Sequence, residues 1–367
     1  MAPRIDGSAA GDVPLFGGFE PEEHDPRVPS ERAPVPRRDD PFFGTSFVDF
    51  ENVNGVHLSG SILWCDTIRK NGLSFLSSAL AGDIAKNRRV LCTEATARLA
   101  TRGKGKLDVL VAPYAQSLDV GDLRLSLHPA GHLLGSAQLR IERGGRTLVY
   151  AADVCTRPSG TTVRAEPVAC DVLAIAATHG GRAFQVPDRE EVLEQIRTFV
   201  DGALETKRPP VLLVPPLGIG QELIVSLGHM GYPIRAHKQV ADVAKIYGEL
   251  GVLMPPIKRF GKRISKGEVG IFPSILRSRI EQLVPEARIG FVGPRALDPA
   301  FVHQLGVQAA FPISNIADRA ELLELVEKTG AREVFLTGGY VESFGADLRD
   351  RGYRVHDLLP RRQLELF

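Results

Sequence analysis

The sequence predicts an α/β protein in which a small parallel-sheet domain is inserted into a larger sandwich of two sheets. Residues 42 to about 180 hold many short β-branched runs separated by turns, which suits one half of an αββα sandwich. From residue 186 to about 290, strand-like and helix-like runs alternate instead. At 367 residues the chain is also longer than the ~250–300 residues at which single cores stop growing.

The sandwich elements are predicted from short apolar runs bounded by turn residues. In the first part, strands are expected at 60–64, 89–92, 107–112, 123–127, 137–142, 146–151 and 172–176. After the insertion, the chain is expected to return with a strand at 288–292, a helix at 318–329, a strand at 333–336 and a helix at 341–351.

The inserted domain is predicted to begin with a helix at 189–205. Its apolar residues recur at helical spacing and are Val192, Leu193, Ile196, Phe199 and Val200. A buried type of strand follows at 210–214. Further elements are expected as a helix at 220–230, a short strand at 234–235 and a helix at 240–251.

These changes of pattern give the domain boundaries. The first part of the sandwich is expected at 42–185, the inserted domain at 186–290 and the second part of the sandwich at 291–360. Residues 1–41 contain eight prolines and little apolar surface, so we expect a disordered tail. Residues 361–367 form a separate C-terminal peptide.

The composition indicates an ordinary globular protein, with 43% hydrophobic and 24% charged residues. A net charge of +1 gives no global field that favours nucleic acid, so any polyanion site must be a local patch. Four cysteines without paired spacing favour buried thiols in a reducing compartment over disulfides or a zinc knuckle. No signal segment and no run of 18 apolar residues is found, which predicts a cytoplasmic protein without a membrane partner.

One motif carries a family resemblance. Residues 128–138 read His128-Pro-Ala-Gly-His132-Leu-Leu-Gly-Ser-Ala-Gln, and a later strand ends in Asp153. This resembles metallo-β-lactamase-fold nucleases of the β-CASP family, in which such a His binds zinc and such an Asp bridges two metals. Segments 216–223, 231–237, 311–318 and 334–340 resemble further motifs of the family. The resemblance covers residues 43–367 and implies a metallo-β-lactamase αββα sandwich with an inserted β-CASP domain roofing the metal cleft.

The resemblance also shows where the metal ligands are missing. It implies metal positions at Ser78, Leu80, Gly82, Asp83, His132, Asp153 and Gly338. Only His132 and Asp153 keep the family residue, and Asp83 is a carboxylate where a His is expected. Leucine and glycine cannot coordinate zinc, so neither metal keeps the three or four protein ligands that tight binding requires.

We therefore expect no catalytic residue and no cofactor, with one weakly bound zinc on His132, Asp153 and Asp83 as the alternative. For each of the two retained residues a structural role is also open. His132 suits a core histidine, and Asp153 suits a cap at the end of a strand.

Phosphate contacts are expected mainly from one basic segment. Residues 258–266 contain five basic residues and one aromatic, among them Lys258, Arg259, Lys262 and Arg263. Such a segment can neutralise phosphates and stack a base, and a plain solvated loop is the equal alternative. His237 ends the segment that resembles the family strand lying near the scissile phosphate, so it is a further candidate.

The C-terminal peptide resembles the motif that binds the bacterial sliding clamp. It ends the chain with Gln363, Leu364, Glu365, Leu366 and Phe367. An extended peptide of this kind binds through a glutamine at a pocket entrance and apolar anchors in adjacent pockets. The alternative is a final strand whose apolar side chains pack on the sandwich.

Together these features favour a catalytically inactive β-CASP nuclease homologue. Its expected role is a nucleic-acid-binding or scaffold subunit in DNA repair, replication or RNA processing. The partners implied are DNA or RNA, the sliding clamp, an active paralogue, or the ligase and helicase with which similar bacterial exonucleases are associated. A residual metal-dependent exonuclease or phosphodiesterase and a pure protein-interaction module are the alternatives.

Overall fold

The computed structural model describes residues 49–52, 54–68, 72–82, 89–102 and 109–358. All of them belong to the second of two compact units, which spans residues 36–367. The predicted N-terminal tail, Asp83 and the C-terminal peptide lie outside the described residues.

The first sheet has six short strands in the order β1-β2-β3-β4-β5-β6. Their bounds are β1 Phe50–Asn52, β2 Val56–Leu58, β3 Leu63–Cys65, β4 Leu73–Phe75, β5 Val90–Cys92 and β6 Val109–Val111. The strands from β3 onward are parallel. Helix α1 (Glu94–Ala100) follows β5, and the Thr93 side chain caps it by accepting from the Thr96 N–H.

The second sheet has seven strands in the order β19-β18-β11-β10-β9-β8-β7. Their bounds are β7 Ser117–Val120, β8 Leu123–Pro129, β9 Ala137–Arg143, β10 Arg146–Ala152, β11 Val172–Ala176, β18 Glu333–Thr337 and β19 Arg354–Asp357. Strands β10, β11, β18 and β19 are parallel. Their carboxyl ends therefore lie at one edge of the sheet.

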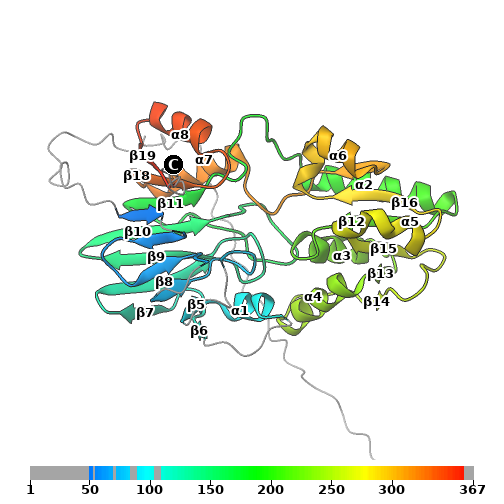
Figure 1. Ribbon diagram of the computed structural model, residues 1–367, viewed down its shortest axis with the longest axis horizontal. Coiled ribbons are helices and arrows are strands. Elements are labelled where there is room, and N and C mark those ends of the chain that lie inside the picture. The colour runs from blue at the N-terminus through cyan, green and yellow to red at the C-terminus, as the bar shows by residue number, and fades with distance from the viewer. Residues whose placement is uncertain (1–48, 53, 69–71, 83–88, 103–108, 359–367) are drawn as a thin grey trace, which may run out of the picture. The chain divides into compact units, whose positions relative to one another are not determined.

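The two sheets pack face to face with helices on both outer sides (Figure 1). Alternate residues of β8 to β10 point into the core between the sheets, where the rings of Phe75 and Tyr150 meet edge to face at 6.2 Å. Helix α1 covers the first sheet, and helices α7 (Arg319–Thr329) and α8 (Val341–Asp350) cover the second. The predicted αββα sandwich is confirmed.

The third sheet has six parallel strands in the order β14-β13-β15-β12-β16-β17. Their bounds are β12 Pro210–Val214, β13 Ile234–Ala236, β14 Ile257–Arg259, β15 Val269–Pro273, β16 Arg288–Val292 and β17 Ala309–Phe311. One face is covered by α2 Arg189–Glu205, α3 Ile219–His229 and α4 Lys238–Glu249. The other is covered by η1 Ser274–Arg279, α5 Ile280–Leu283, η2 Pro294–Leu297 and α6 Pro299–Leu305.

One strand lies in a different sheet from the one expected. The sequence predicted that residues 288–292 return to the sandwich, but as β16 they pair with β12 in the third sheet. The apolar pattern identifies the strand, while its partner depends on contacts between residues about 78 positions apart. The chain re-enters the sandwich only after β17, through α7. The domain boundaries drawn from the sequence stay predictions.

The remaining structural expectations concern cysteines and membrane spans. Cys65, Cys92, Cys155 and Cys170 are all buried and unpaired, as predicted. Within the described part of the chain, no helix is both long and apolar enough to cross a membrane.

Candidate functional site at the carboxyl edge of the second sheet

The carboxyl edge of the second sheet brings together residues that are far apart in the sequence. Asp153 follows β10, His179 follows β11 and Gly338 follows β18. Because these strands are parallel and adjacent, the segments after them are neighbours, the usual place for a site in such sheets. The loop after β8 brings His132 to the same edge, since β8 runs in the same direction as β10.

Asp153 is positioned by an irregularity in strand β10. Ala152 has a left-handed backbone with φ 44°, and the pairing of β10 with β11 shifts register between Tyr150 and Ala152. Such bulges redirect side chains at the ends of strands. The Thr178 hydroxyl donates to Asp153 Oδ1 at 2.6 Å. One carboxylate oxygen is thus engaged within the protein, in agreement with the strand-end role considered from the sequence.

His132 is buried, with 6% of its surface exposed. Its Nδ1 lies 3.1 Å from the carbonyl oxygen of Asn315, and Asn315 Nδ2 donates to the carbonyl oxygen of His132 at 2.6 Å. A carbonyl only accepts, so Nδ1 carries the proton and Nε2 carries the lone pair. Burial lowers the pKa of His132, against the opposing effect of the Asp153 carboxylate, and favours the neutral ring.

His179 lies near both residues and was not singled out from the sequence. Its ring stacks on Phe184 with a centroid distance of 3.8 Å, and its Nδ1 lies 3.4 Å from the Ser314 hydroxyl. Burial lowers the pKa of His179 to about 4, while the charge of Asp153 acts in the opposite direction. The sequence signal was its place three residues after the end of a buried strand.

Asp66 is the second residue that sequence reasoning missed. It follows β3 with φ 50°, and its carboxylate accepts from the Ser77 N–H at 2.8 Å and the Ser77 hydroxyl at 2.6 Å. The Tyr150 hydroxyl donates to it at 2.9 Å and so links the two sheets. Burial raises the pKa of Asp66 to about 6, although these hydrogen bonds act to lower it. A polar residue directly after a predicted strand was the available signal.

Gly135 and Ser136 fix the loop that carries His132. A Cβ at Gly135 would lie 2.6 Å from the Ala95 Cβ, and the Gly135 carbonyl accepts from the hydroxyls of Thr93 and Thr96. The Ser136 hydroxyl accepts from the Leu133 N–H at 3.0 Å. Close packing against α1 and a backbone amide therefore both require small residues here.

The loop beside His132 packs directly against the third sheet's helices. Leu133 belongs to a buried apolar cluster whose members are Leu99, Leu133, Leu217, Val243 and Tyr247. These residues come from α1, from the loop after β8 and from the α3 and α4 region. A Cβ at Gly218, just before α3, would lie 2.5 Å from Leu133 Cδ2. Apolar side chains therefore fill this part of the space between the sandwich and α3–α4.

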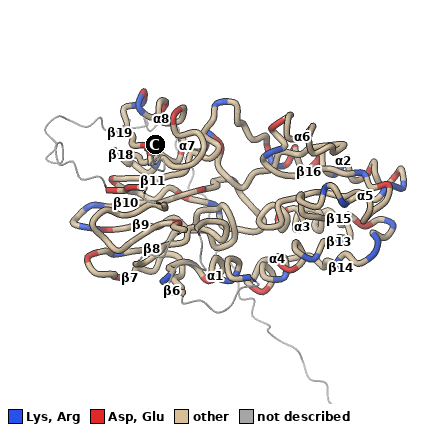
Figure 2. Tube along the Cα trace, viewed as in Figure 1, with Lys and Arg blue, Asp and Glu red and all other residues tan. Residues whose placement is uncertain are grey.

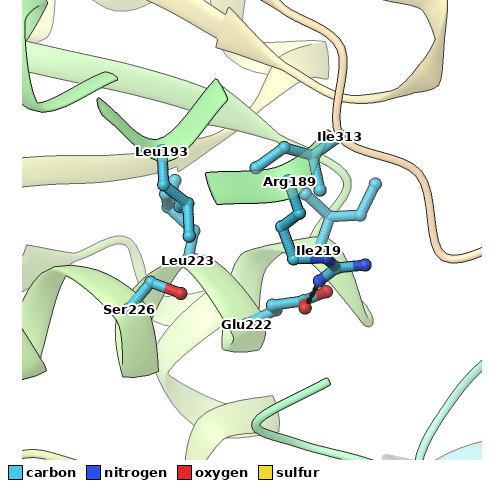
Figure 3. A pocket seen from close by; sticks show the side chains of 7 residues that line it. All are labelled: Arg189, Leu193, Ile219, Glu222, Leu223, Ser226 and Ile313. Carbon is cyan, nitrogen blue, oxygen red and sulfur yellow. Dashed lines mark ion pairs between the residues drawn. The ribbon is translucent and has the colours of Figure 1, made fainter. Parts of the chain in front are cut away.

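An arginine of α2 also lies near the contact between the sandwich and the third sheet's helices. Arg189 of α2 forms an ion pair with Glu222 of α3, next to Ile219 and Ile313 (Figure 3). The hollow these side chains line is too small for a water molecule. Ile219 is buried there. The Arg189 guanidinium also donates to the Ser314 carbonyl at 3.2 Å.

Arg157, in the loop after β10, binds the same segment of chain. Its guanidinium pairs with Glu321 at 2.6 Å and donates to the Ile316 carbonyl at 2.7 Å and the Ser314 carbonyl at 3.5 Å. Both Arg157 and Arg189 are therefore engaged by protein groups.

Three known proteins relate this architecture to a family. The chain is 30% identical over 328 residues, 87% of its length, to a probable DNA ligase of Opitutus terrae. It is 32% identical over 114 residues, 29% of its length, to the transcription termination factor FttA of Lokiarchaeum sp.. It is 30% identical over 116 residues, 31% of its length, to the cleavage and polyadenylation specificity factor subunit 3 of Dictyostelium discoideum. The chain belongs to the β-CASP family of metallo-β-lactamase-fold nucleases.

The β-CASP chain spans a small part of these relatives, with 32% of the ligase, 17% of FttA and 15% of the polyadenylation factor subunit covered. No model of a protein family matches the chain.

The metal donors of this β-CASP protein do not form a two-zinc set in the described residues. No group of three or more His, Cys, Asp or Glu side chains converges there on one point. Ser78 is buried and accepts from the Leu80 N–H at 3.4 Å, and Leu80 is 60% exposed. His132 Nε2 and the second oxygen of Asp153 are the donors that remain. Asp83, the third candidate ligand, lies outside the described residues.

Two of the positions at which the resemblance places metal ligands are glycines with a left-handed backbone. Gly82 has φ 58° and Gly338 has φ 88°, both in the left-handed region that favours glycine. A Cβ at Gly82 would lie 3.0 Å from the Thr67 carbonyl oxygen, and one at Gly338 would lie 3.1 Å from the Thr178 nitrogen. A histidine at either position would need a shift of the backbone.

Some of the residues predicted to contact phosphate are engaged by other protein groups, and others are exposed. His237 caps α4, because its Nδ1 accepts from the Gln239 N–H at 3.3 Å, which leaves Nε2–H as a donor. Lys258 lies 3.7 Å from Glu268, and Arg259 pairs with Asp242. Lys262 and Arg263 are exposed.

The aromatic residue of the basic segment does not stack outward. Phe260 packs edge to face on Phe272, with ring centroids 4.8 Å apart. The ring is partly buried and packs against the core of the third sheet. That it stacks a base stays a prediction.

Proposed function

We propose that this β-CASP protein is a catalytically inactive member of its family that serves as a nucleic-acid-binding or scaffold subunit. The observation that carries the proposal is the donor set at the carboxyl edge of the second sheet. Two-metal hydrolysis needs two ions ~3.5–4 Å apart with three or four protein ligands each. Two described donors, His132 and Asp153, occupy family ligand positions, while Ser78, Leu80, Gly82 and Gly338 stand at others.

The local packing supports the same proposal. The left-handed backbone at Gly82 and Gly338 disfavours a side chain, which supports the proposed loss of ligands at these two positions. Leu133 fills the space beside His132 with apolar contacts. A phosphodiester at this place would displace well-packed side chains, which costs free energy.

The pathway we propose is DNA repair or replication. The relative aligned over most of this chain is a probable DNA ligase, and the aligned part forms about a third of that protein. A segment joined to a ligase in one polypeptide supports a working partnership between the same two components when they are separate chains. We therefore propose a DNA ligase as partner, with an associated helicase or an active paralogue in the same assembly. The transcription termination and polyadenylation relatives support RNA processing as the alternative.

A residual one-metal phosphodiesterase is the second candidate, and one observation favours it. Metal-binding histidines usually donate their other nitrogen to a carbonyl, as His132 Nδ1 does to Asn315. His132 Nε2, Asp153 and Asp83 would then hold one weakly bound zinc, which would act as a Lewis acid on a phosphate oxygen.

Metal content and cleavage together test the proposal. We expect purified protein to contain far less than one zinc per chain, measured by inductively coupled plasma mass spectrometry. We expect no cleavage of labelled single- or double-stranded DNA or RNA with added zinc, manganese or magnesium. His132→Ala/Asp153→Ala is the matched control for contaminating nuclease. Stoichiometric zinc, or cleavage that this variant abolishes, would establish the second candidate instead.

A further inference from the structure

The side of the third sheet that faces the sandwich offers few free cations. Helices α3 and α4 lie on this side, with Leu217, Val243 and Tyr247 buried against sandwich residues. Arg189 is paired with Glu222, and Arg157 with Glu321. Phosphates that approached here would compete with carboxylates already in place.

The opposite face of the third sheet carries a different layer. We call it the outer layer, and it consists of the segment 260–268, η1, α5, η2 and α6. Phe260 and Ile264 anchor the segment on Phe272, and η1 and α5 continue the cover across β15 and β12. Since α2, α3 and α4 cover the other face, the outer layer points away from the helices that meet the sandwich.

The outer layer is rich in basic residues. Its acidic side chains form hydrogen bonds, an ion pair or a helix cap with neighbouring groups. The segments of the outer layer hold six Lys or Arg and two Asp or Glu, and Asp298 lies between η2 and α6, in a chain whose net charge is +1. Glu268 accepts two hydrogen bonds from Arg235, Glu281 pairs with Arg277, and Asp298 caps α6.

Three free cations, Lys262, Arg263 and Lys266, lie within five consecutive residues, and Figure 2 shows blue segments beside β14. Within the described residues, no carboxylate lies within ion-pair distance of the exposed side chains of Lys262, Arg263, Lys266, Arg279 and Arg295.

The aromatic residues of the outer layer point to phosphate rather than base contacts. Phe260 packs on Phe272, and the guanidinium of Arg295 covers the Phe301 ring at 3.7 Å from its centroid. Both rings are partly buried, which leaves less ring surface for a base. The free cations also lie on a loop and on 3-10 turns, not on a long helix or a two-stranded ribbon that could enter a duplex groove. A flexible single strand can instead bring successive phosphates to these side chains.

We propose that the outer layer binds the phosphodiester backbone of single-stranded DNA, without sequence preference and away from the former metal cleft. This rests on the proposed function, in which the protein binds nucleic acid. Lys262, Arg263, Lys266 and Arg279 supply the contacts. The strand lies over segment 260–268 and η1, and the carboxyl edge of the second sheet takes no part.

Charge reversal on the outer layer tests the proposal in the full-length protein. The probe is a fluorescein-labelled oligonucleotide of mixed sequence, and its anisotropy is followed at several salt concentrations. We expect Lys262→Glu/Arg263→Glu to raise Kd by about tenfold or more and to reduce the salt slope by about 1.4, for two phosphate contacts. Arg279→Glu should weaken binding further. The matched control is Lys328→Glu/Arg351→Glu, an equal charge change at an exposed position of α7 and at the exposed residue directly after α8, which should leave Kd within about twofold.

Several results would overturn the proposal. One is an unchanged Kd and salt slope in Lys262→Glu/Arg263→Glu, and another is an equal loss in the control, since that would report net charge alone. A loss of the same size in His237→Asn, which keeps the α4 cap, would place binding at the carboxyl edge of the third sheet instead. RNA of the same sequence binding about tenfold more tightly would remove the assignment to DNA.

Failure of this inference can be told apart from failure of the proposed function. A wild-type protein that binds no oligonucleotide would overturn the outer-layer proposal and leave the inactive-scaffold role standing. Zinc content and cleavage, measured separately, decide whether the protein is inactive.

Discussion

Asn315 and His132 hold each other through two reciprocal hydrogen bonds between loops 183 residues apart. The histidine Nδ1 meets the Asn315 carbonyl at 3.1 Å, and the Asn315 amide donates to the His132 carbonyl at 2.6 Å. Both residues are buried. The pair ties the sandwich loop after β8 to the segment that leaves the third sheet.

Removing the Asn315 amide should destabilise the protein. Asn315→Asp replaces the donor by an acceptor and leaves the buried His132 carbonyl without a partner, so we expect a loss of about 1–3 kcal/mol in the free energy of unfolding. Urea unfolding followed by circular dichroism measures it. Gln304→Ala, at an exposed position of α6, is the control and should change stability by less than about 0.5 kcal/mol. Equal effects in the two variants would show that the hydrogen bond contributes nothing.

Restoring a ligand at Gly338 should not restore a metal site. Gly338→Ala should cost about 1–2 kcal/mol for its left-handed backbone and more for crowding against Thr178. Gly352→Ala is the matched control, because Gly352 has φ 90° and no atom within 4 Å of its Cβ position. The difference between the two variants isolates the crowding. Gly338→His should be at least as unstable as Gly338→Ala and should bind no additional zinc, and a gain of one zinc per chain would contradict this.

Asp66 should make the stability depend on pH. Its pKa is about 6 in the folded protein, raised by burial from 3.8, so the folded state binds the proton more tightly than the unfolded state. The group stabilises the protein when protonated, and this contribution is lost as pH rises from about 4 through 6. Asp66→Asn keeps an oxygen that can accept from the Ser77 N–H and does not titrate.

Relative to wild type, the Asp66→Asn variant should therefore gain stability between pH 4 and pH 7, by up to about 3 kcal/mol. Urea unfolding at four pH values measures the gain. Asp119→Asn, an exposed carboxylate on β7, controls for charge. A difference between Asp66→Asn and wild type that is constant with pH would contradict the assignment.

The C-terminal peptide should bind the sliding clamp with micromolar affinity, roughly −8 kcal/mol. Its residues lie outside the described part of the chain, so the sequence alone carries this prediction. Leu366→Ala/Phe367→Ala should abolish detectable binding in surface plasmon resonance because the apolar anchors supply most of the free energy. The thermal stability should not change. A large fall in melting temperature would mean that these side chains pack in the core.

The sequence predicted long and strongly patterned elements well. The runs at 172–176, 189–205 and 210–214 coincide with β11, α2 and β12, because burial imposes a continuous or helical apolar pattern. Strands β1, β2 and β4 were missed, since three residues are too few to show a period. The sheet to which β16 belongs could not be read from its own residues.

The candidate site was predicted in part. The motif at 128–138 and the strand end at 153 identified His132 and Asp153. Asp66 and His179 are single polar residues after strand ends, and nothing local distinguishes them from ordinary caps. Their importance comes from Tyr150, Ser77 and Phe184, which only the folded chain brings to them.

The Ser314 carbonyl accepts hydrogen bonds from two guanidinium groups. Arg157 donates from the sandwich, and Arg189 donates from α2. Enzymes that admit a substrate and release a product commonly swing one lobe against the other about a short connecting segment. Here the connecting segment, which contains Ser314, is hydrogen-bonded both to the sandwich and to α2. The two lobes should therefore move as one rigid body, and amide protons around residues 313–317 should exchange as slowly as those of the central strands. Such rigidity would suit the proposed role of holding a partner in place.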